Sequence, residues 1–242
     1  MENLYETRRL VDEYLLFHYG STEEIMPWAG GPVAALDFPV RTVRELLPDS
    51  FLPGRALDMG CAVGRSSFEL SGRFDSVVGM DYSQAFIGAA VTVRDAGSLD
   101  YQVAVEGHVV QPLVARRPED ARPDRVEFRQ GDAMNLPGDL GVFDVVHAAN
   151  LICRLRDPLK FLHRLPELVR VGGLVLLTTP CTWLAEFTPP DRWPQGRTFE
   201  WLNEILGADF DLVSQKDLPF LIREHARKFQ WSVAMGTVWR RL

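Results

Sequence analysis

The sequence predicts an α/β fold built on a seven-stranded, mostly parallel sheet. Short apolar runs end at Asp58, Asp81, Gln130, Asn150 and Thr179, and helical patterns follow three of the first four. Such alternation is typical of parallel strands joined by right-handed crossovers in a doubly wound sheet. Two long strand-like runs close the sequence without a clear helix between them, which predicts an antiparallel hairpin at one sheet edge.

The helical patterns differ in how clearly they are bounded. Asn3 and Glu6 match a capping box for the first helix, which should end near Gly20. Glycine and proline residues predict a loop over 21–36. Pro166 disturbs the pattern of the helix in which it lies. The expected helices span 5–19, 38–47, 64–72, 83–96 and 157–169, with one more after Thr198.

Residues 97–125 are long for a link between a helix and a strand in a compact domain. Within them Tyr101, Val103 and Val105 alternate with other residues, a pattern that could form a small extra hairpin. The segment is either a functional insertion or a plain elaboration of the fold. We expect one domain over 1–242, with 1–50 as an N-terminal helical lid and 51–242 as the ligand-binding core.

The composition is that of a globular protein, with 46% hydrophobic and 24% charged residues among 242. A net charge of −7 argues against a general nucleic-acid binder. Cys61, Cys153 and Cys181 lack the spacing of a metal site and suit a reducing compartment. The N-terminal residues lack the apolar core of a secretory signal, and no apolar run is long enough to span a membrane. We expect a soluble cytoplasmic protein without a metal, nucleic-acid or membrane partner.

The stretch "ALDMGCAVGRSSFEL" at 56–70 indicates a ligand-binding turn between a strand and a helix. A dinucleotide fingerprint would place its third glycine where Arg65 stands, and a P-loop would place a lysine there before Ser66. Asp58, just ahead of the glycines, would repel a phosphate and attract a cationic ligand. These features disfavour a nicotinamide oxidoreductase.

The turn resembles the first motif of the class I S-adenosylmethionine-dependent methyltransferases, D/E-x-G-x-G-x-G, with Asp58, Gly60, Ala62 and Gly64 in its four places. Further segments match in order: "VVGMDYS", "FRQGDAMNLP", "FDVVHAANLICRLRDP" and "RVGGLVLLTTP". The resemblance implies a Rossmann-like fold, with S-adenosylmethionine as methyl donor and S-adenosylhomocysteine as product. Alanine at position 62 is a mild departure, because it still lets the backbone approach a ligand.

The resemblance also implies a donor site. Asp81 would bind both ribose hydroxyls, and Asp132 with Ala133 would read the adenine. Taken singly, Asp58 could instead cap a helix, Asp81 could form a turn, and Asp132 could sit in an exposed β-turn. The full set of expected donor-site residues is Asp58, Gly60, Cys61, Ala62, Gly64, Arg65, Asp81, Tyr82, Phe86, Asp132, Ala133 and Asn150.

The flanking segments are similar to a narrower family, the 4-mercaptohistidine N1-methyltransferases of ovothiol biosynthesis. They are "DEYLLFHYGS", "GCAVGRSSFEL", "ANLICRL", "TTPCTWLAEFTP" and "LPFLIREHARKFQWS". In many relatives this unit is the C-terminal domain of a larger ovothiol synthase. The similarity implies methyl transfer to the side-chain (π) ring nitrogen of 5-thiohistidine, giving ovothiol A. The enzyme that forms thiohistidine would then be its functional partner.

Such an acceptor carries a soft thiolate and a ring nitrogen, so the site must aim the nitrogen at the methyl group and hold the sulfur aside. His18, Tyr19 and His225 are the candidates for accepting the nitrogen's proton. The candidate residues on the acceptor side could instead serve the fold alone. The segment around 223–231 could be a solvated hairpin tip, Arg154 could be a surface residue, and Trp183 and Phe187 could belong to the core. The expected acceptor-site residues are Tyr14, Arg154, Trp183, Phe187, Arg223, Glu224, Arg227, Lys228 and Trp231.

Two other functions stay open at this point. The acceptor could be another small imidazole or thiol compound, or a natural-product nucleophile. Alternatively, the protein could bind S-adenosylmethionine without catalysis and regulate a partner enzyme.

Overall fold

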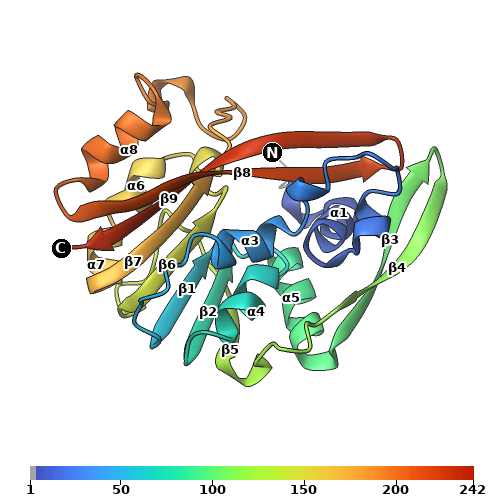
Figure 1. Cartoon of the computed structure of the whole chain (residues 1–242), viewed down its shortest axis with the longest axis horizontal. Coiled ribbons are helices and arrows are strands. Elements are labelled where there is room, and N and C mark those ends of the chain that lie inside the picture. The colour runs from blue at the N-terminus through green and yellow to red at the C-terminus, as the bar shows by residue number, and fades with distance from the viewer. Residues whose placement is uncertain (1–3) are drawn as a thin grey trace.

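The computed structural model describes residues 4–242 and has a seven-stranded sheet at its centre (Figure 1). Its strands are β1 (Arg55–Met59), β2 (Ser76–Asp81), β5 (Val126–Gln130), β6 (Phe143–Ala149), β7 (Val169–Thr179), β8 (Phe210–His225) and β9 (Lys228–Arg241). They lie in the order β5-β2-β1-β6-β7-β9-β8. The first five run parallel, and β9 pairs antiparallel with both β7 and β8. The predicted fold class and edge hairpin are confirmed.

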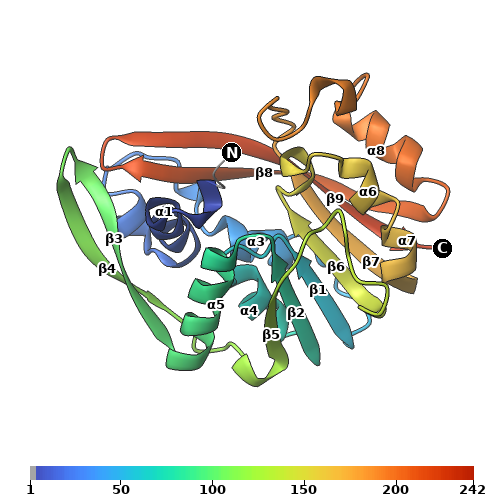
Figure 2. The same ribbon diagram turned by 180° about the vertical axis from the view of Figure 1, so that it is seen from behind.

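Helices cover both faces of this sheet (Figure 2). They are α1 (Arg8–Tyr19), α2 (Thr22–Ile25), α3 (Phe38–Arg44), α4 (Arg65–Ser71), α5 (Gln84–Ala96), α6 (Pro158–Leu162), α7 (Leu165–Leu168) and α8 (Thr198–Leu206). Short 3-10 helices are η1 (Leu4–Glu6), η2 (Val33–Ala35), η3 (Pro123–Arg125), η4 (Ile152–Arg154) and η5 (Pro190–Arg192).

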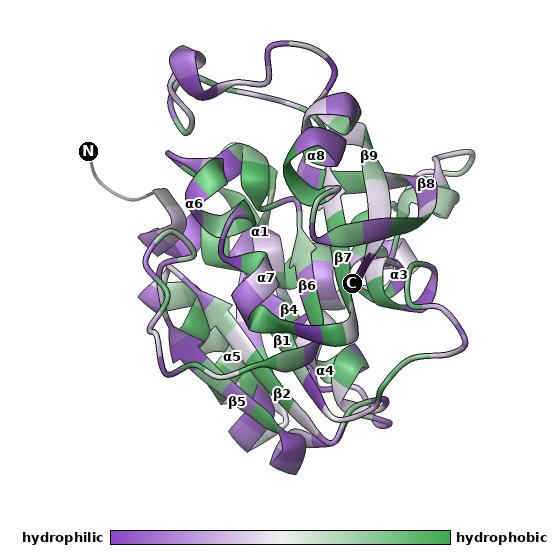
Figure 3. Cartoon of the chain, turned by 90° about the vertical axis from the view of Figure 1, so that its left-hand side faces the viewer, coloured by the Kyte–Doolittle hydropathy of each residue, from purple (hydrophilic) through white to green (hydrophobic). Residues whose placement is uncertain are grey.

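The strands are apolar on both sides because two cores flank the sheet. Ala56 packs into the core with α1, α3, α4 and α5, whereas its neighbour Leu57 packs into the core with α6, α7 and α8. Successive strand side chains point to opposite faces, so a doubly covered strand reads as a continuous apolar run. Green apolar segments accordingly run along the central strands in Figure 3. No helix within residues 4–242 has the length and apolar character needed to cross a membrane.

The N-terminal elements differ in detail from the sequence prediction. Helix α1 begins at Arg8 rather than at residue 5, because the Thr7 hydroxyl accepts a hydrogen bond from the Leu10 amide and caps the helix there. Asn3, the other half of the expected capping box, lies outside the described residues. The predicted loop 21–36 contains the short helix α2, which has a capping box of its own formed by Ser21 and Glu24.

The predicted helix 157–169 is two short helices, α6 and α7. Pro166 lies in the first turn of α7, where the missing amide hydrogen costs nothing. The same proline could not lie in the interior of one longer helix without disrupting it. The interruption expected from Pro166 is therefore a complete break between residues 162 and 165.

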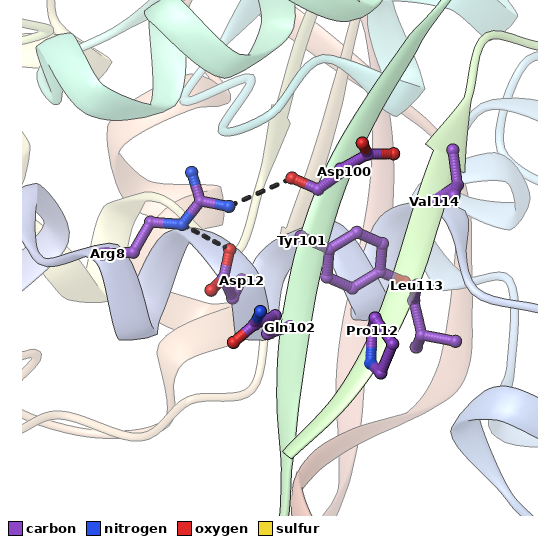
Figure 4. A pocket seen from close by; sticks show the side chains of 8 residues that line it. All are labelled: Arg8, Asp12, Asp100, Tyr101, Gln102, Pro112, Leu113 and Val114. Carbon is purple, nitrogen blue, oxygen red and sulfur yellow. Dashed lines mark hydrogen bonds and ion pairs between the residues drawn. The ribbon is translucent and has the colours of Figure 1, made fainter.

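The segment 97–125 forms the hairpin anticipated from its alternation, with strands β3 (Ser98–Glu106) and β4 (Val109–Arg116) in a separate two-stranded sheet. Helix α1 lies between this hairpin and the outer part of β8 and β9 in both ribbon views (Figures 1 and 2). At a shallow pocket on its surface, Arg8 Nε lies 2.9 Å from Asp12 Oδ1 and Arg8 donates to the Asp100 carbonyl at 3.1 Å (Figure 4). The insertion thus supports the N-terminal helix.

Glycine at position 64 is required by both backbone conformation and packing. Its φ is +89°, and a Cβ there would lie 2.6 Å from the Phe128 ring and 3.1 Å from the Ala90 methyl group. We expect Gly64→Ala to lower the free energy of unfolding by about 2–4 kcal/mol, from the left-handed backbone and from overpacking. Denaturant unfolding followed by circular dichroism measures this change.

Gly88 in α5 is the matched control, since nothing lies within 4 Å of a Cβ built there. Gly88→Ala should raise stability by about 0.5–1 kcal/mol through helix propensity alone. Equal effects of the two substitutions would contradict the packing account of Gly64.

Candidate functional site

The turn after β1 has the backbone conformation of a close-approach loop. Gly60, Ala62 and Gly64 all have positive φ, of 75°, 47° and 89° respectively. Alanine tolerates this region less well than glycine. At Ala62 the conformation is supported by a hydrogen bond of 2.9 Å from its amide to Asp81 Oδ2. The departure from the motif at position 62 therefore preserves the shape of the turn.

Asp58 does not line the cavity, contrary to the sequence-based expectation. The side chain is completely buried, and its two oxygens are occupied by protein partners. Ser67 Oγ donates to Oδ2 at 2.5 Å, and His147 Nδ1 lies 2.7 Å from Oδ1. His147 Nε2 in turn lies 3.0 Å from the Thr42 hydroxyl. A carboxylate at the end of a strand can point into the core when such partners are present, or into a ligand cavity when they are not. The residue type alone does not distinguish these two orientations.

Asp81, at the end of β2, does face the cavity. Its carboxylate accepts hydrogen bonds of 2.9 Å from the amides of Ala62 and Ser83, which hold it between the turn and the start of α5. Burial raises the pKa of Asp81 to about 6, although both amide bonds oppose the shift. These two hydrogen bonds hold the carboxylate in a fixed position. Because it is buried, further hydrogen bonds from a ligand would stabilise its ionised form.

Two further strand ends complete this side of the cavity. Asp132 Oδ1 accepts from the Met134 amide at 2.8 Å, which fixes the turn after β5. Asn150, after β6, has a φ of 53° and exchanges hydrogen bonds with Thr178 of β7. Positive φ at a residue other than glycine is tolerated where surrounding contacts fix it.

These strand ends open onto a cavity of about 490 Å³. Its volume is in the usual range for small-molecule sites, and its position at the carboxyl edge of the parallel strands is where ligands bind in open α/β sheets. We call one side the strand-end wall. Its residues include Gly60, Ala62, Asp81, Tyr82, Asp132, Ala133, Met134 and Asn150.

Aromatic side chains from distant parts of the chain also line the cavity and are here called the aromatic wall: Tyr14, Phe17, His18, Phe38, Phe86, Phe187 and Phe220. Each of these rings except that of Phe187 contacts another of them, with centroids 4.7 Å apart for Tyr14 and Phe86 and 4.8 Å apart for Phe38 and Phe220. Such a surface suits a flat, partly apolar ligand. Two arginines, Arg154 and Arg156, also line the cavity, and the Arg154 guanidinium stands 4.7 Å from the centre of the Phe187 ring.

Of the three groups considered for proton transfer, only His18 lines the cavity. Burial lowers the pKa of His18 to about 3, so its imidazole is neutral at physiological pH. The Tyr19 hydroxyl donates to the Val63 carbonyl at 2.7 Å, and burial raises its pKa well above the usual value. His225 lies at the β8–β9 turn, where its Nδ1 accepts from the Arg227 amide. The placement of Tyr19 and His225 does not support a catalytic role.

Twelve of the predicted site residues line the cavity: Tyr14, His18, Gly60, Ala62, Asp81, Tyr82, Phe86, Asp132, Ala133, Asn150, Arg154 and Phe187. The structure places the others outside its lining: Tyr19, Asp58, Cys61, Gly64, Arg65, Trp183, Arg223, Glu224, His225, Arg227, Lys228 and Trp231. Among the latter, Gly64 serves packing, and half-buried Arg65 lies 3.6 Å from Glu69 in its own helix. Trp183 instead donates to the Thr198 hydroxyl and packs against Trp201.

The charged hairpin tip lies beyond the cavity because β8 and β9 stay paired almost to their ends. The Ala226 amide there donates to the Val105 carbonyl of β3. Lys228 pairs with Glu224 at 2.7 Å, and the Arg227 guanidinium lies over the Trp28 ring. We therefore leave these residues out of the proposed acceptor site. Sequence reasoning missed Tyr5, Phe17, Phe38, Phe220 and Ile222, which do line the cavity.

A methyltransferase-domain family model matches residues 35–228, most of the chain. The chain belongs to this methyltransferase family. S-adenosylmethionine is therefore its methyl donor, and the fold and donor predicted from the sequence are confirmed. A search of the curated proteins gave no match.

Solved structures of low sequence identity share the fold. The N-methyltransferase NodS from Bradyrhizobium japonicum WM9, in complex with S-adenosyl-L-homocysteine, is 14% identical with a TM-score of 0.57, covering 96% of this chain and 98% of that one. The [4+2]-cyclase SpnF is 14% identical with a TM-score of 0.56, covering 98% and 97%. A structure on the conversion of a disulfide bond into a thioacetal group during echinomycin biosynthesis is 19% identical with a TM-score of 0.54, covering 79% and 77%.

The strand-end wall fits the methyl donor chemically. A ribose offers two hydroxyl donors, which a fixed carboxylate such as Asp81 can accept, and the turn at 131–134 offers backbone groups to an adenine. The lining holds the carboxylates of Asp81 and Asp132 and carries none of the lysines of a phosphate-binding loop. When bound, the donor supplies an electrophilic methyl group on a sulfonium. The residues of the strand-end wall would hold its nucleoside portion beside the aromatic wall.

The pKa of Asp81 makes donor binding pH-dependent. The ionised carboxylate is the better acceptor for two hydroxyls, so affinity should be full above about pH 6 and fall as the carboxyl protonates below it. We expect calorimetric titration with S-adenosylhomocysteine to show this loss between about pH 8 and about pH 5. Asp81→Asn should bind at least about tenfold more weakly at the higher pH and show a nearly flat profile. A variant that keeps the wild-type affinity and profile would contradict this role of Asp81.

Proposed function

We propose that the protein transfers a methyl group from S-adenosylmethionine to the π ring nitrogen of 5-thiohistidine, forming ovothiol A. The proposal joins the sequence similarity to the shape of the cavity. It further holds that residues 1–50 act as a lid on a single domain. The reaction would take place in the cytoplasm, where a reducing environment keeps the acceptor thiol and the protein's cysteines free. An enzyme that forms thiohistidine would supply the acceptor.

The observation that supports this acceptor is the combination of an aromatic wall with the Arg154 guanidinium beside it. A heteroaromatic ring can lie against Tyr14, Phe17 and Phe38, while an anionic group of the same molecule reaches Arg154. Thiohistidine has a heteroaromatic imidazole ring, and its carboxylate and its sulfur can each supply the anionic group.

The choice between nitrogen and sulfur is a matter of orientation rather than of fold. NodS is an N-methyltransferase, whereas the echinomycin structure concerns sulfur chemistry, and both share this architecture. In-line attack requires the nitrogen lone pair to point at the methyl carbon as the bond from that carbon to the donor sulfur breaks. Holding two reactants in such an arrangement supplies up to about 7–11 kcal/mol of the barrier reduction.

His18 lines the cavity, and we infer that it contacts the acceptor ring as a neutral group. With a pKa near 3, His18 is too weak a base to hold a proton at physiological pH. We therefore assign it a hydrogen bond to the acceptor and not the role of general base. This revises the expectation that His18 serves as the general base.

Replacing His18 separates these two roles. His18→Phe keeps an aromatic ring and removes both nitrogens, so we expect the acceptor KM to rise about tenfold from the lost hydrogen bond. The shape of the kcat profile between about pH 6 and about pH 9 should not change, because a group with this pKa does not titrate there. If the substitution removed a titration from that profile, His18 would be the base after all.

Two alternatives differ in measurable ways. Another small imidazole, thiol or natural-product acceptor would be methylated in preference to thiohistidine, and a non-catalytic binding protein would consume no donor. The existence of SpnF, named a cyclase on this same fold, shows why the acceptor must be tested directly.

Incubation with S-adenosylmethionine and 5-thiohistidine, followed by tandem mass spectrometry, tests the proposal. We expect S-adenosylhomocysteine and a product carrying the methyl group on the π nitrogen. Histidine serves as the control acceptor without sulfur. An S-methylated product, or donor turnover only with other acceptors, would contradict the assignment.

A further inference from the structure

The residues just before α1 are fastened to the start of α5. The Glu6 carboxylate accepts hydrogen bonds from the Gln84 amide at 2.9 Å and from the Ala85 amide at 3.1 Å. The Ser83 hydroxyl donates to the Tyr5 carbonyl at 2.8 Å. A carboxylate on the first amides of a helix is favourable both as a cap and through the helix dipole. Glu6 is thus bonded to a helix far from it in the sequence.

This attachment places the Tyr5 ring in the cavity. The ring lies 5.7 Å from that of Phe86 and 6.2 Å from that of Phe187, so it spans the space between α5 and the segment after β7. Burial raises the pKa of the Tyr5 phenol, and the nearby Arg154 guanidinium opposes that rise. Tyr5 therefore joins the aromatic wall to the Arg154 guanidinium beside it.

The charge of Arg154 is not balanced by an ion pair with any residue that the structure describes. Its contacts are the Phe187 ring, the Tyr5 phenol and the Thr182 carbonyl at 3.4 Å. The lining holds three acidic residues, Asp81, Asp132 and Glu186, and none of them forms an ion pair with Arg154 among the described residues. A half-buried guanidinium with neutral partners is a favourable site for an anion.

We propose that Tyr5 and Arg154 together bind an anionic group of the acceptor, and that Glu6 is a positioning residue that holds Tyr5 in this site. The proposal rests on the proposed function, whose acceptor carries two such groups, a carboxylate and a thiolate. Both are acceptors of hydrogen bonds from a guanidinium and a phenol. Loss of Glu6 would free the N-terminus of α5 and let Tyr5 leave the cavity, without changing the strand-end wall.

The test is calorimetric titration of 5-thiohistidine into protein saturated with S-adenosylhomocysteine, which needs no turnover. Tyr5→Phe, Arg154→Gln and Glu6→Ala should each weaken acceptor binding about tenfold or more. The affinity for S-adenosylhomocysteine alone should change less than about twofold in Glu6→Ala. Hydrogen exchange at the amides of Gln84 and Ala85 should accelerate in Glu6→Ala, and Glu6→Gln should restore part of the acceptor affinity.

Glu13→Ala is the matched control, because it also removes a carboxylate from the N-terminal segment but only from a pair with Arg9 on α1. Two analogues identify the anion: the carboxamide of thiohistidine lacks the carboxylate, and histidine lacks the thiol. The analogue whose binding no longer responds to Arg154→Gln lacks the group that Arg154 binds. If all three variants bound 5-thiohistidine as tightly as the wild type does, this inference would be overturned and the proposed function would stand. Failure of the wild type to bind 5-thiohistidine would overturn the proposed function with it.

Discussion

The contact on which the site most depends is the buried pairing of Asp58 with His147. Both side chains are almost completely excluded from solvent, and they link four elements: Thr42 on α3, Asp58 on β1, Ser67 on α4 and His147 on β6. Removing one partner of a buried hydrogen bond typically costs about 1–3 kcal/mol, because the remaining polar group is left without a partner. The network therefore fixes the turn after β1 before any ligand arrives.

The rest of the cavity follows from this fixed turn. With the turn in place, the Ala62 amide reaches Asp81, and Asp81 in turn accepts from the Ser83 amide at the start of α5. The same helix receives Glu6, so the N-terminal segment is brought onto the cavity through α5. Thr42 lies on α3, whose first residue is Phe38 of the aromatic wall. Donor and acceptor sides are thus tied to one polar network in the core.

The parallel sheet, its edge hairpin and the cavity residues at strand ends could be predicted because they depend on local sequence patterns. Asp81 and Asp132 end apolar runs, and the carboxyl ends of parallel strands meet at one edge. Asp58 also ends such a run, but its direction depends on His147, which is 89 residues away. No pattern near Asp58 shows that partner.

Long-range packing explains the other differences. The spacing of Asn3 and Glu6 in the sequence predicted a local helix cap. Glu6 instead accepts hydrogen bonds from amides 78 and 79 residues away, a contact that no local pattern indicates. Phe220 and Ile222 alternate on β8 and could have been recognised as facing one side, but only the fold shows that this side meets α3 and α1. The charged residues beyond them attracted attention as an acceptor site, yet at the hairpin tip Lys228 pairs with Glu224 and Arg227 lies over the Trp28 ring.

A crystal structure of the complex with S-adenosylhomocysteine tests the central claim most directly, because it shows which carboxylate meets the ligand. The account predicts ribose hydroxyls on Asp81, the adenine beside Asp132 and Ala133, and Asp58 still paired with His147 and Ser67. A ligand bound to a reoriented Asp58 carboxylate, or bound outside this cavity, would contradict it.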